Sequence, residues 1–221
     1  NNMNFVIDSI YNTFPYYCLN LHSVGNLVSF SAIPENYYAE NIINSLGNLI
    51  IGIISQGDVC YQESEDRLIG SGCEMQIVPE KGYWLILHEN LEVEFCIENA
   101  ISINYDVEYY LEEGANLISF PYDGSINVSD AVPDDVEYNL LSIISESTAS
   151  INSLEGWIGS INSFSGNKGY WINSDQELLF QYDLGTLGRT KNIEKSNKLI
   201  NYKYMQSTNQ AFYFIEEIED I

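Results

Sequence analysis

The feature that most constrains this chain is an internal repeat. Asn-Leu-Val-Ser-Phe at residues 26–30 returns as Asn-Leu-Ile-Ser-Phe at 116–120, at an offset of 90. Three further short sequences return in the same order at offsets of 90, 89 and 87: Ile-Ile-Ser at 53–55 and 143–145, Ile-Gly-Ser at 69–71 and 158–160, and Lys-Gly-Tyr-Trp at 81–84 and 168–171. A period near 90 residues is too long for a solenoid unit and has the size of a small domain. The sequence therefore predicts two tandem modules that each bury a core.

The repeat divides the chain into five parts: an N-terminal segment at 1–18, a first repeat module at 19–95, a connecting strand or linker at 96–108, a second module at 109–182, and a tail at 183–221. In the connecting segment Ile101, Ile103 and Tyr105 alternate, which predicts a strand and keeps the modules close neighbours. The tail holds five of the eight basic residues and ends in Gln-Ala-Phe-Tyr-Phe-Ile at 210–215, a pattern that predicts the first strand of a further β module.

Within each module the pattern is mainly β. The Asn-Leu-x-Ser-Phe and Gly-Tyr-Trp sequences follow glycine turns, and residues 91–95 alternate apolar and acidic side chains as a half-buried strand does. One short helix is expected in each repeat. In the first, Pro34 suits the first helical turn, four apolar residues up to Leu46 share one face, and Gly47 ends it. In the second, a single turn is expected at 127–132 before Pro133. The predicted class is mainly β, with two tandem small β-sandwich- or barrel-like domains and a C-terminal β segment.

The charge is sparse and nearly all negative. Asp and Glu total 32 against 8 Lys and Arg, which gives a net charge of -24. Neutralising phosphates needs clustered basic residues, so nucleic-acid binding is excluded as a function class, and an anionic membrane would repel the chain. The longest apolar run, at 49–54, is too short to cross a bilayer. The chain has neither an initiator Met nor a signal peptide, so we expect it to be a piece of a longer protein.

The repeated sequences resemble a recurring module of secreted and cell-surface proteins from marine and sediment bacteria, some archaea and marine viral contigs. Its pattern is N-L-I-S-F, then G-W-x-G-S, then G-Y-W. The first repeat matches at 26–30 and 82–84, and the second at 116–120, 156–160 and 169–171. Residues 206–214, Gln-Ser-Thr-Asn-Gln-Ala-Phe-Tyr-Phe, resemble the opening of another β module. The first repeat departs from the pattern, because Leu-Ile-Gly-Ser replaces G-W-x-G-S.

The resemblance implies an accessory, structural or adhesive module without a catalytic set of residues. It also implies an extracellular, cell-surface or viral-particle location. The expected function is thus a non-enzymatic structural or adhesive protein that builds or decorates a surface, fibre or appendage. Its partners would be other subunits, neighbouring modules or surface glycans. The alternative is a glycan-binding accessory module of a secreted enzyme, and a small hydrolase with a carboxylate pair ranks third.

The four cysteines are spaced by 42, 13 and 23 residues, which argues against a zinc site because such sites favour close pairs. In an extracellular chain an even number suggests disulfides, with three connectivities open. We favour Cys60 with Cys73 across a hairpin-like excursion, and Cys18 with Cys96 closing the first repeat. The alternative is four buried thiols.

The remaining polar candidates carry little specific signal. His22 and His88 lie in the first repeat, without the spacing of a catalytic triad, and are interpreted as structural or surface residues. No cofactor is expected. Calcium is the weaker alternative, at two acidic clusters: Asp134, Asp135 and Glu137, and Glu63, Glu65 and Asp66. Without ligand spacing, a solvated acidic surface is the favoured interpretation.

The aromatic residues are the candidate binding residues. In a strand, one member of each Tyr-Trp pair faces the core and the other faces outward. An outward aromatic row would bind glycan or protein, whereas the inward residues fill the core. The candidate residues for binding glycan or protein are Trp84, Trp157, Tyr170 and Trp171.

Overall fold

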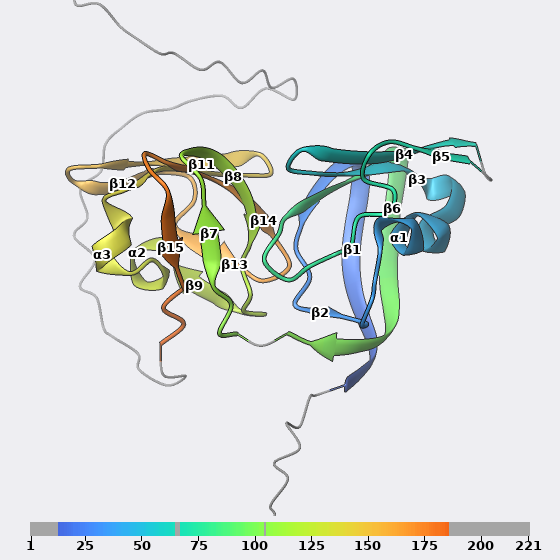
Figure 1. Cartoon of the computed structure of the whole chain (residues 1–221), viewed down its shortest axis with the longest axis horizontal. Coiled ribbons are helices and arrows are strands. Elements are labelled where there is room, and N and C mark those ends of the chain that lie inside the picture. The colour runs from blue at the N-terminus through green and yellow to red at the C-terminus, as the bar shows by residue number, and fades with distance from the viewer. Residues whose placement is uncertain (1–12, 65–66, 104, 186–221) are drawn as a thin grey trace, which may run out of the picture. The chain divides into compact units, whose positions relative to one another are not determined.

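The computed structural model describes residues 13–64, 67–103 and 105–185, all within one compact unit (Figure 1). It is mainly β, as predicted from the sequence, with antiparallel sheets and a few short helices. The described part has no helix of the length and hydropathy that would span a membrane. The predicted strand at 210–215 and the basic tail lie outside the described residues.

The first repeat (β1 to β6) forms a six-stranded sheet in the order β1-β6-β3-β4-β5, with β2 paired to β6. Its strands are β1 (Thr13–Val28), β2 (Ala32–Ile33), β3 (Ile50–Ser55), β4 (Asp58–Ser64), β5 (Arg67–Ile69) and β6 (Tyr83–Ser102). The long strands β1 and β6 form one continuous antiparallel ribbon, whose register shifts once, between His22 and Val24. β6 therefore runs through the predicted strand at 91–95 into the connecting segment.

Helix α1 (Ala39–Leu46) and the 3-10 turn η1 (Gly47–Leu49) connect β2 to β3. The buried face of α1 carries the apolar periodicity seen in the sequence, and Gly47 ends the helix at φ 54°. The expected start at Pro34 is wrong. Residues 35–36 form a turn, with Asn36 at φ 53°. Tyr38 is extended and pairs with Gln76 in an isolated bridge, and the N–H of Ala39 donates to the carbonyl of Met75, so the helix begins only at Ala39.

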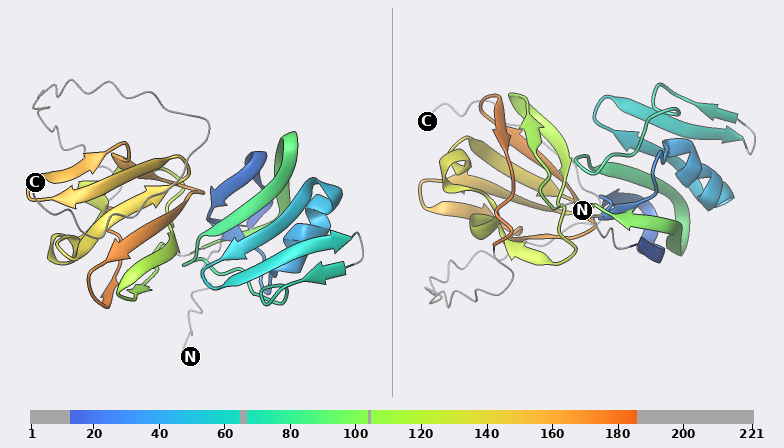
Figure 2. Two further views of the ribbon diagram at one scale, coloured as in Figure 1. Left: turned by 90° about the horizontal axis from the view of Figure 1, so that it is seen from above. Right: turned by 60° about the horizontal axis from the view of Figure 1, so that its bottom comes forward.

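The second repeat (β7 to β15) divides the same path among more strands (Figure 2). Its five-stranded sheet has the order β12-β11-β10-β14-β8, and two small sheets pair β13 with β9 and β15 with β7. The strands are β7 (Tyr109–Leu111), β8 (Gly114–Ser119), β9 (Ser125–Asn127), β10 (Leu140–Ser145), β11 (Thr148–Ser153), β12 (Gly156–Gly159), β13 (Ser163–Ser165), β14 (Gly169–Ser174) and β15 (Leu178–Phe180). Both main sheets have edge strands, so the barrel form is not present in the described residues.

Two single-turn helices lie in the second repeat, where one was expected. α2 (Val128–Ala131) falls inside the expected stretch, and α3 (Asp134–Glu137) follows Pro133 directly. Pro133 serves as the N-cap of α3, and three carboxylates in the first turn complement the positive end of a helix. Proline thus begins a second helix as well as ending the first.

Each repeat has its own hydrophobic core. The first core is mostly aliphatic and lies between Leu19 and Ala100 in the sequence. The second lies between Val107 and Tyr182 and is rich in aromatic rings. Phe164 stacks on Phe120 at a centroid distance of 5.4 Å, and Tyr182 makes edge contacts with both rings at 5.1 Å.

Candidate functional site

The two Tyr-Trp pairs divide as the strand alternation predicts. Tyr83 and Tyr170 are 0% and 3% exposed and belong to the first and second cores. Trp84 and Trp171 are half-buried and belong to neither core. Tyr170 is therefore a core residue and is not available for binding, whereas Trp84 and Trp171 lie on the outer faces of their sheets.

The surroundings of the two outward tryptophans are apolar and match between repeats. Ile54 is the cross-strand partner of Trp84, and Ile144 is the partner of Trp171. Exposed aliphatic residues continue each face along the neighbouring strands, with Val59 opposite Ile54 in the first repeat. These faces are the candidate binding surfaces that remain from the sequence analysis.

Trp157 occupies a different environment. It packs against the second core from β12, and its indole N–H donates to the Glu137 carboxylate at 2.6 Å. This bond ties β12 to α3, so Trp157 has a structural role in the second repeat.

The serines of the repeated Asn-Leu-x-Ser-Phe sequence lie between the repeats. Ser29 and Ser119 are both fully buried. The N–H of Ser29 donates to the carbonyl of Asn167, and its hydroxyl donates to the carbonyl of Lys168. The N–H of Ser119 donates in the matching way to the carbonyl of Glu80, but its hydroxyl donates to the carbonyl of Pro79, two residues before the counterpart of Lys168. Each repeat thus bonds the turn before the Gly-Tyr-Trp strand of the other.

The leucines of the same sequence fill the space between the repeats. Leu27 and Leu117 are 0% and 2% exposed, yet neither belongs to a repeat core. A Cβ added at Gly169 would lie 2.9 Å from Leu27 Cδ1, and one at Gly82 would lie 2.8 Å from Leu117 Cδ1. The glycine before each Tyr-Trp pair therefore permits the close approach of the other repeat.

A hairpin tip from each repeat covers the edge strand of the other. Gln56, in the β3–β4 turn, accepts a bond from the N–H of Leu117 at 2.8 Å and donates to the carbonyl of Ala115 at 3.2 Å. Glu146, in the equivalent β10–β11 turn, accepts from the N–H of Leu27 at 3.2 Å and contacts the His22 ring with its other oxygen. A carboxylate cannot donate, so His22 supplies the second partner where Gln56 uses a carbonyl.

The asparagines and phenylalanines of the Asn-Leu-x-Ser-Phe sequence make their contacts within their own repeat. Asn26 closes a turn by bonding both the N–H and the carbonyl of His22, each at 2.8 Å. Asn116 bonds the N–H and the carbonyl of Glu112 in the same way. Phe30 and Phe120 lie in their own cores. The inter-repeat surface therefore includes the leucine, the serine, the glycine turn and the hairpin tip of each repeat. The hydroxyls of Tyr17 and Ser31 add to it by donating to the Asn167 side-chain oxygen at 2.6 and 3.0 Å.

The strongest pKa perturbations also fall on buried structural residues. Burial raises the pKa of the Tyr83 and Tyr109 phenols, although each is hydrogen-bonded, to the backbone of Val78 and to Ser119 respectively. Burial also raises the pKa of Tyr182 well above its ordinary value, and its hydroxyl has no hydrogen-bond partner among the described residues. These residues titrate as parts of a core rather than as an acid-base site.

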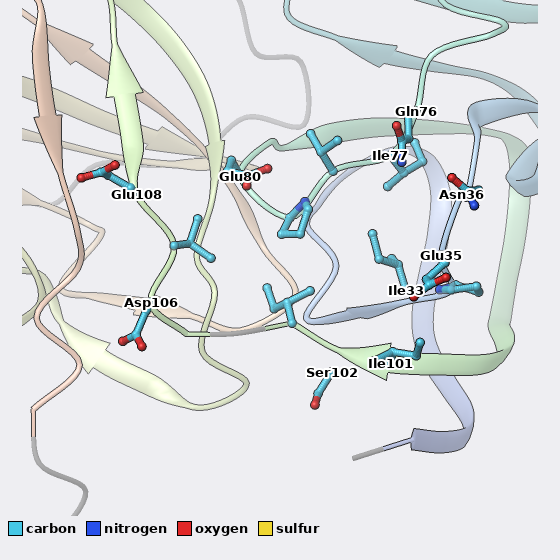
Figure 3. A pocket seen from close by; sticks show the side chains of 15 residues that line it. Ile33, Glu35, Asn36, Gln76, Ile77, Glu80, Ile101, Ser102, Asp106 and Glu108 are labelled. Carbon is cyan, nitrogen blue, oxygen red and sulfur yellow. The ribbon is translucent and has the colours of Figure 1, made fainter. Parts of the chain in front are cut away.

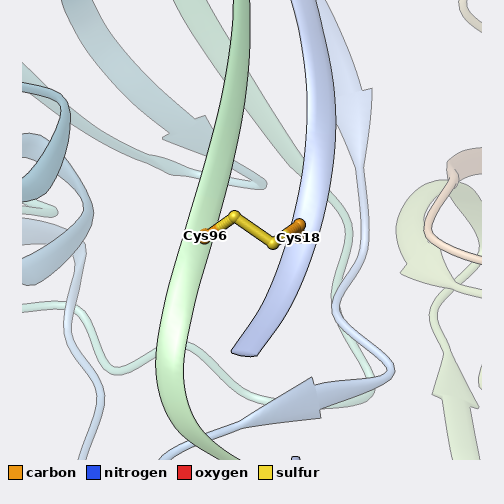
Figure 4. Close-up of a disulfide and its surroundings, with 2 residues drawn as sticks. All are labelled: Cys18 and Cys96. Carbon is orange, nitrogen blue, oxygen red and sulfur yellow. A yellow bond between two sulfur atoms is a disulfide. The ribbon is translucent and has the colours of Figure 1, made fainter. Parts of the chain in front are cut away.

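The cysteines form two disulfides inside the first repeat. Cys18 and Cys96 bridge directly opposite residues of β1 and β6 (Figure 4), and Cys60 joins Cys73. This is the pairing that the spacing favoured, and no free cysteine is found in the described ranges. Across these ranges, the group with metal-ligand spacing is Cys18, Glu94 and Cys96, whose two sulfurs are already bonded to each other.

The other polar candidates are not gathered into one site. His22 contacts Glu146, whereas His88 is exposed on β6. Glu63 pairs with Arg67, and Glu65 and Asp66 lie outside the described residues. Asp134 and Asp135 are exposed in the first turn of the short helix α3. Within the described chain they do not belong to a group of side chains close enough together to bind a metal ion.

A groove of about 670 Å³ lies along the connecting segment (Figure 3). Apolar residues such as Ile33, Ile77 and Ile101 line it. It is also lined by four carboxylates, which belong to Glu35, Glu80, Asp106 and Glu108. The groove cannot be recognised from the sequence pattern, because its residues come from three separate segments.

Comparison with known proteins does not assign this chain to a class of proteins. No protein-family model matches the chain, and no curated protein or solved structure matches it. The fold and the inter-repeat surface define a duplicated, disulfide-containing β protein. The repeat marks the serines and glycines of this surface in the sequence, but it marks the repeated core residues in the same way, since all recur at nearly constant offset.

Proposed function

We propose that this chain is a non-enzymatic structural or adhesive protein of an extracellular or virion surface, in which the paired repeats act as a building block. Its partners would be neighbouring modules or other subunits of a surface, fibre or appendage. The observation that carries the proposal is the use of the repeated residues. Ser29, Ser119, Gly82 and Gly169 serve to dock one repeat on the other.

Two further features support this proposal. Disulfides persist in oxidising environments outside the reducing cytosol, and this chain has two. The high negative charge keeps a β protein soluble and opposes unwanted edge pairing. Both features suit a protein that stands on an exposed surface.

The test is whether the purified, oxidised chain assembles. Native mass spectrometry and electron microscopy over a range of protein and salt concentrations should detect regular oligomers or fibres, because salt screens the negative charge. A chain that stays monomeric at high concentration and in high salt contradicts a self-assembling structural role.

The second candidate is glycan binding, which is favoured by the outward positions of Trp84 and Trp171. Aromatic faces on a sheet supply apolar area for a partner at low entropic cost. A glycan array should then give specific signals that Trp171→Ala abolishes. Trp157→Phe is the matched control, because Trp157 packs on the second core. Signals that survive both Trp84→Ala and Trp171→Ala contradict binding at these faces.

A further inference from the structure

The inter-repeat surface is nearly two-fold symmetric. Val28 forms an isolated bridge to Lys168, and Ile118 forms the matching bridge to Lys81. The serine N–H, leucine and glycine contacts occur twice in the same arrangement, whereas the hydroxyls of Ser29 and Ser119 bond carbonyls at different positions of the turn. Such a surface is isologous, since each partner presents the same patch, and its natural partner is another copy of the same module.

The symmetry is broken in three places. One is Asn167, whose side-chain oxygen accepts from the Tyr17 hydroxyl at 2.6 Å and from the Ser31 hydroxyl at 3.0 Å, and which corresponds to Glu80 at the offset of 87. The other two are pairs of positions. At the offset of 90, Gln56 corresponds to Glu146, and His22 corresponds to Glu112. The backbone at His22 is equivalent to the backbone at Glu112, because Asn26 bonds His22 as Asn116 bonds Glu112. The docked pair therefore places Glu146 against His22 on one side, and Gln56 at the edge strand that follows Glu112 on the other.

These differences determine which repeats can pair. If two second repeats docked on each other, Glu146 of each would meet Glu112 of the other, and adjacent like charges repel. Two first repeats would bring Gln56 to His22 without a charge conflict. Every chain has one first repeat and one second repeat, so the two kinds are present in equal numbers. Because two second repeats repel each other, every second repeat can dock only if it pairs with a first repeat.

The link between the repeats is short and is bonded at both ends. The N–H of Ile103 donates to the carbonyl of Ser31 in the first repeat, and the Gln181 side chain donates to the carbonyl of Asp106 from the second. Val107 already belongs to the second core. Both disulfides lie within the first repeat, so no covalent bond in the described chain ties the repeats together except this link. Short hinges favour the exchange of docked elements between chains.

We propose that the inter-repeat surface also joins chains, with the first repeat of one copy docking on the second repeat of another, and that Glu112 and Glu146 prevent second repeats from pairing. The contacts would be those of the docked pair, supplied by two chains instead of one. This inference rests on the proposed function, which gives assembly its biological role. It deepens that function because it gives the subunits a head-to-tail order.

The first experiment removes residues 104–106 from the full chain, so that a chain can no longer dock its own repeats. Light scattering after size exclusion should show the mass rising from that of a monomer to dimers or longer multiples. Adding Gly169→Val should return the mass to the monomer, because the atoms closest to a Cβ at Gly169 belong to Leu27 and Val28 of the other repeat. Circular dichroism and tryptophan fluorescence check that both variants remain folded. A folded deletion variant that stays monomeric, or that oligomerises equally with Gly169→Val, overturns the proposal.

The second experiment tests the pairing rule. A protease site placed in the link is cut after the chain has folded, and native mass spectrometry measures which halves associate. Complexes of one first and one second repeat should dominate, and pairs of second repeats should be absent. Glu112→His should make such pairs appear, because Glu146 then meets a histidine, whereas the neighbouring Glu113→His should not.

The outcomes separate this proposal from the proposed function. Pairs of second repeats in the unmodified protein, or none with Glu112→His, would show that these carboxylates do not set the pairing. If the deletion variant forms oligomers through the surface but the intact chain never assembles, the docking rule stands and the structural role falls.

Discussion

The two repeats share a docking surface but stabilise their cores differently. The first repeat keeps β1 and β6 continuous and links them by Cys18–Cys96. The second repeat breaks the same path into β7 and β8 on one side and β14 and β15 on the other. It has no cysteine and gathers aromatic rings around Phe164 and Tyr182 instead.

This difference shows what the fold requires of each module. The leucine, serine and glycine that meet the other repeat are the same in both modules, whereas the residues that fill each core vary in kind. A core accepts different combinations of hydrophobic residues if its volume is filled, but a surface that must fit a partner accepts fewer. The contrast predicts that the two repeats respond differently to reduction, truncation and alkali, and alike to damage at their shared surface.

The largest effect should come from removing the Cys18–Cys96 disulfide by alanine at both positions. The bond spans a sequence separation of 78, and the chain-entropy model gives it roughly 4 to 5 kcal/mol of stability. The first repeat should then unfold before the second. Urea unfolding measures the order of unfolding if it is followed by Trp84 fluorescence in a variant without Trp157 and Trp171, and by Trp171 fluorescence in a variant without Trp84 and Trp157.

The control for that prediction is the removal of Cys60–Cys73. Its separation is only 13, so the same model gives a smaller loss of about 3 kcal/mol. Equal losses for the two disulfides, or a first repeat that remains as stable as the second, would contradict the view that β1 and β6 depend on their covalent link.

A somewhat smaller effect is expected from truncating the second core at Phe164. Phe164→Ala should cost about 3 to 5 kcal/mol, because the ring is fully buried. The equivalent change in the first repeat is Ile77→Ala. It should cost about 1 kcal/mol less, since Ile77 makes no ring-ring contacts. Urea unfolding of both variants gives the comparison, and a larger loss for Ile77→Ala would argue against an aromatic origin of the second repeat's stability.

The shared surface should give equal effects in both repeats. Gly82→Val and Gly169→Val each push a side chain into a leucine of the other repeat, and overpacking of this kind costs about 1 to 3 kcal/mol. The two losses in unfolding free energy should agree. Ala149→Val, on the exposed face of β11, is the control and should change stability by less than about 0.5 kcal/mol. Clearly unequal losses would show that the two halves of the symmetric surface contribute unequally to the unfolding free energy.

The smallest effect at neutral pH concerns the buried tyrosines. Burial raises the pKa of Tyr83, Tyr109 and Tyr182 in the folded state above the ordinary value of 10.0. The unfolded chain therefore loses these protons first, so their contribution to stability is complete below pH 10 and is lost as the pH rises above it. Two of the three lie in the second core, so the second repeat should unfold first in alkali.

Phenolate absorbance and circular dichroism recorded together against pH check this prediction. The last step in phenolate absorbance should coincide with the loss of β structure, and Trp171 fluorescence should change before Trp84 fluorescence. Complete and reversible ionisation of all tyrosines in a folded chain would contradict it.

Several features were predictable because they depend on local periodicity. Tyr83 and Trp84 face opposite sides of β6 because strand side chains alternate, and α1 forms where apolar residues recur on one helical face. The end of β6 at Ser102 and the start of α1 at Ala39 were not predictable, because pairing with distant strands sets both boundaries. The separation of Trp157 from the other tryptophans depends on its bond to Glu137, which residue spacing does not reveal.

The sequence by itself determined that this is a duplicated, acidic, mainly β protein, because repeat offset, charge and alternation are properties of the chain. Only the tertiary structure decided how Asn-Leu-x-Ser-Phe is used. Its asparagine closes a turn, its phenylalanine fills its own core, and its leucine and serine meet the other repeat. All four residue types become buried, so the sequence marks them alike. Only the fold distinguishes burial within one module from burial against its partner.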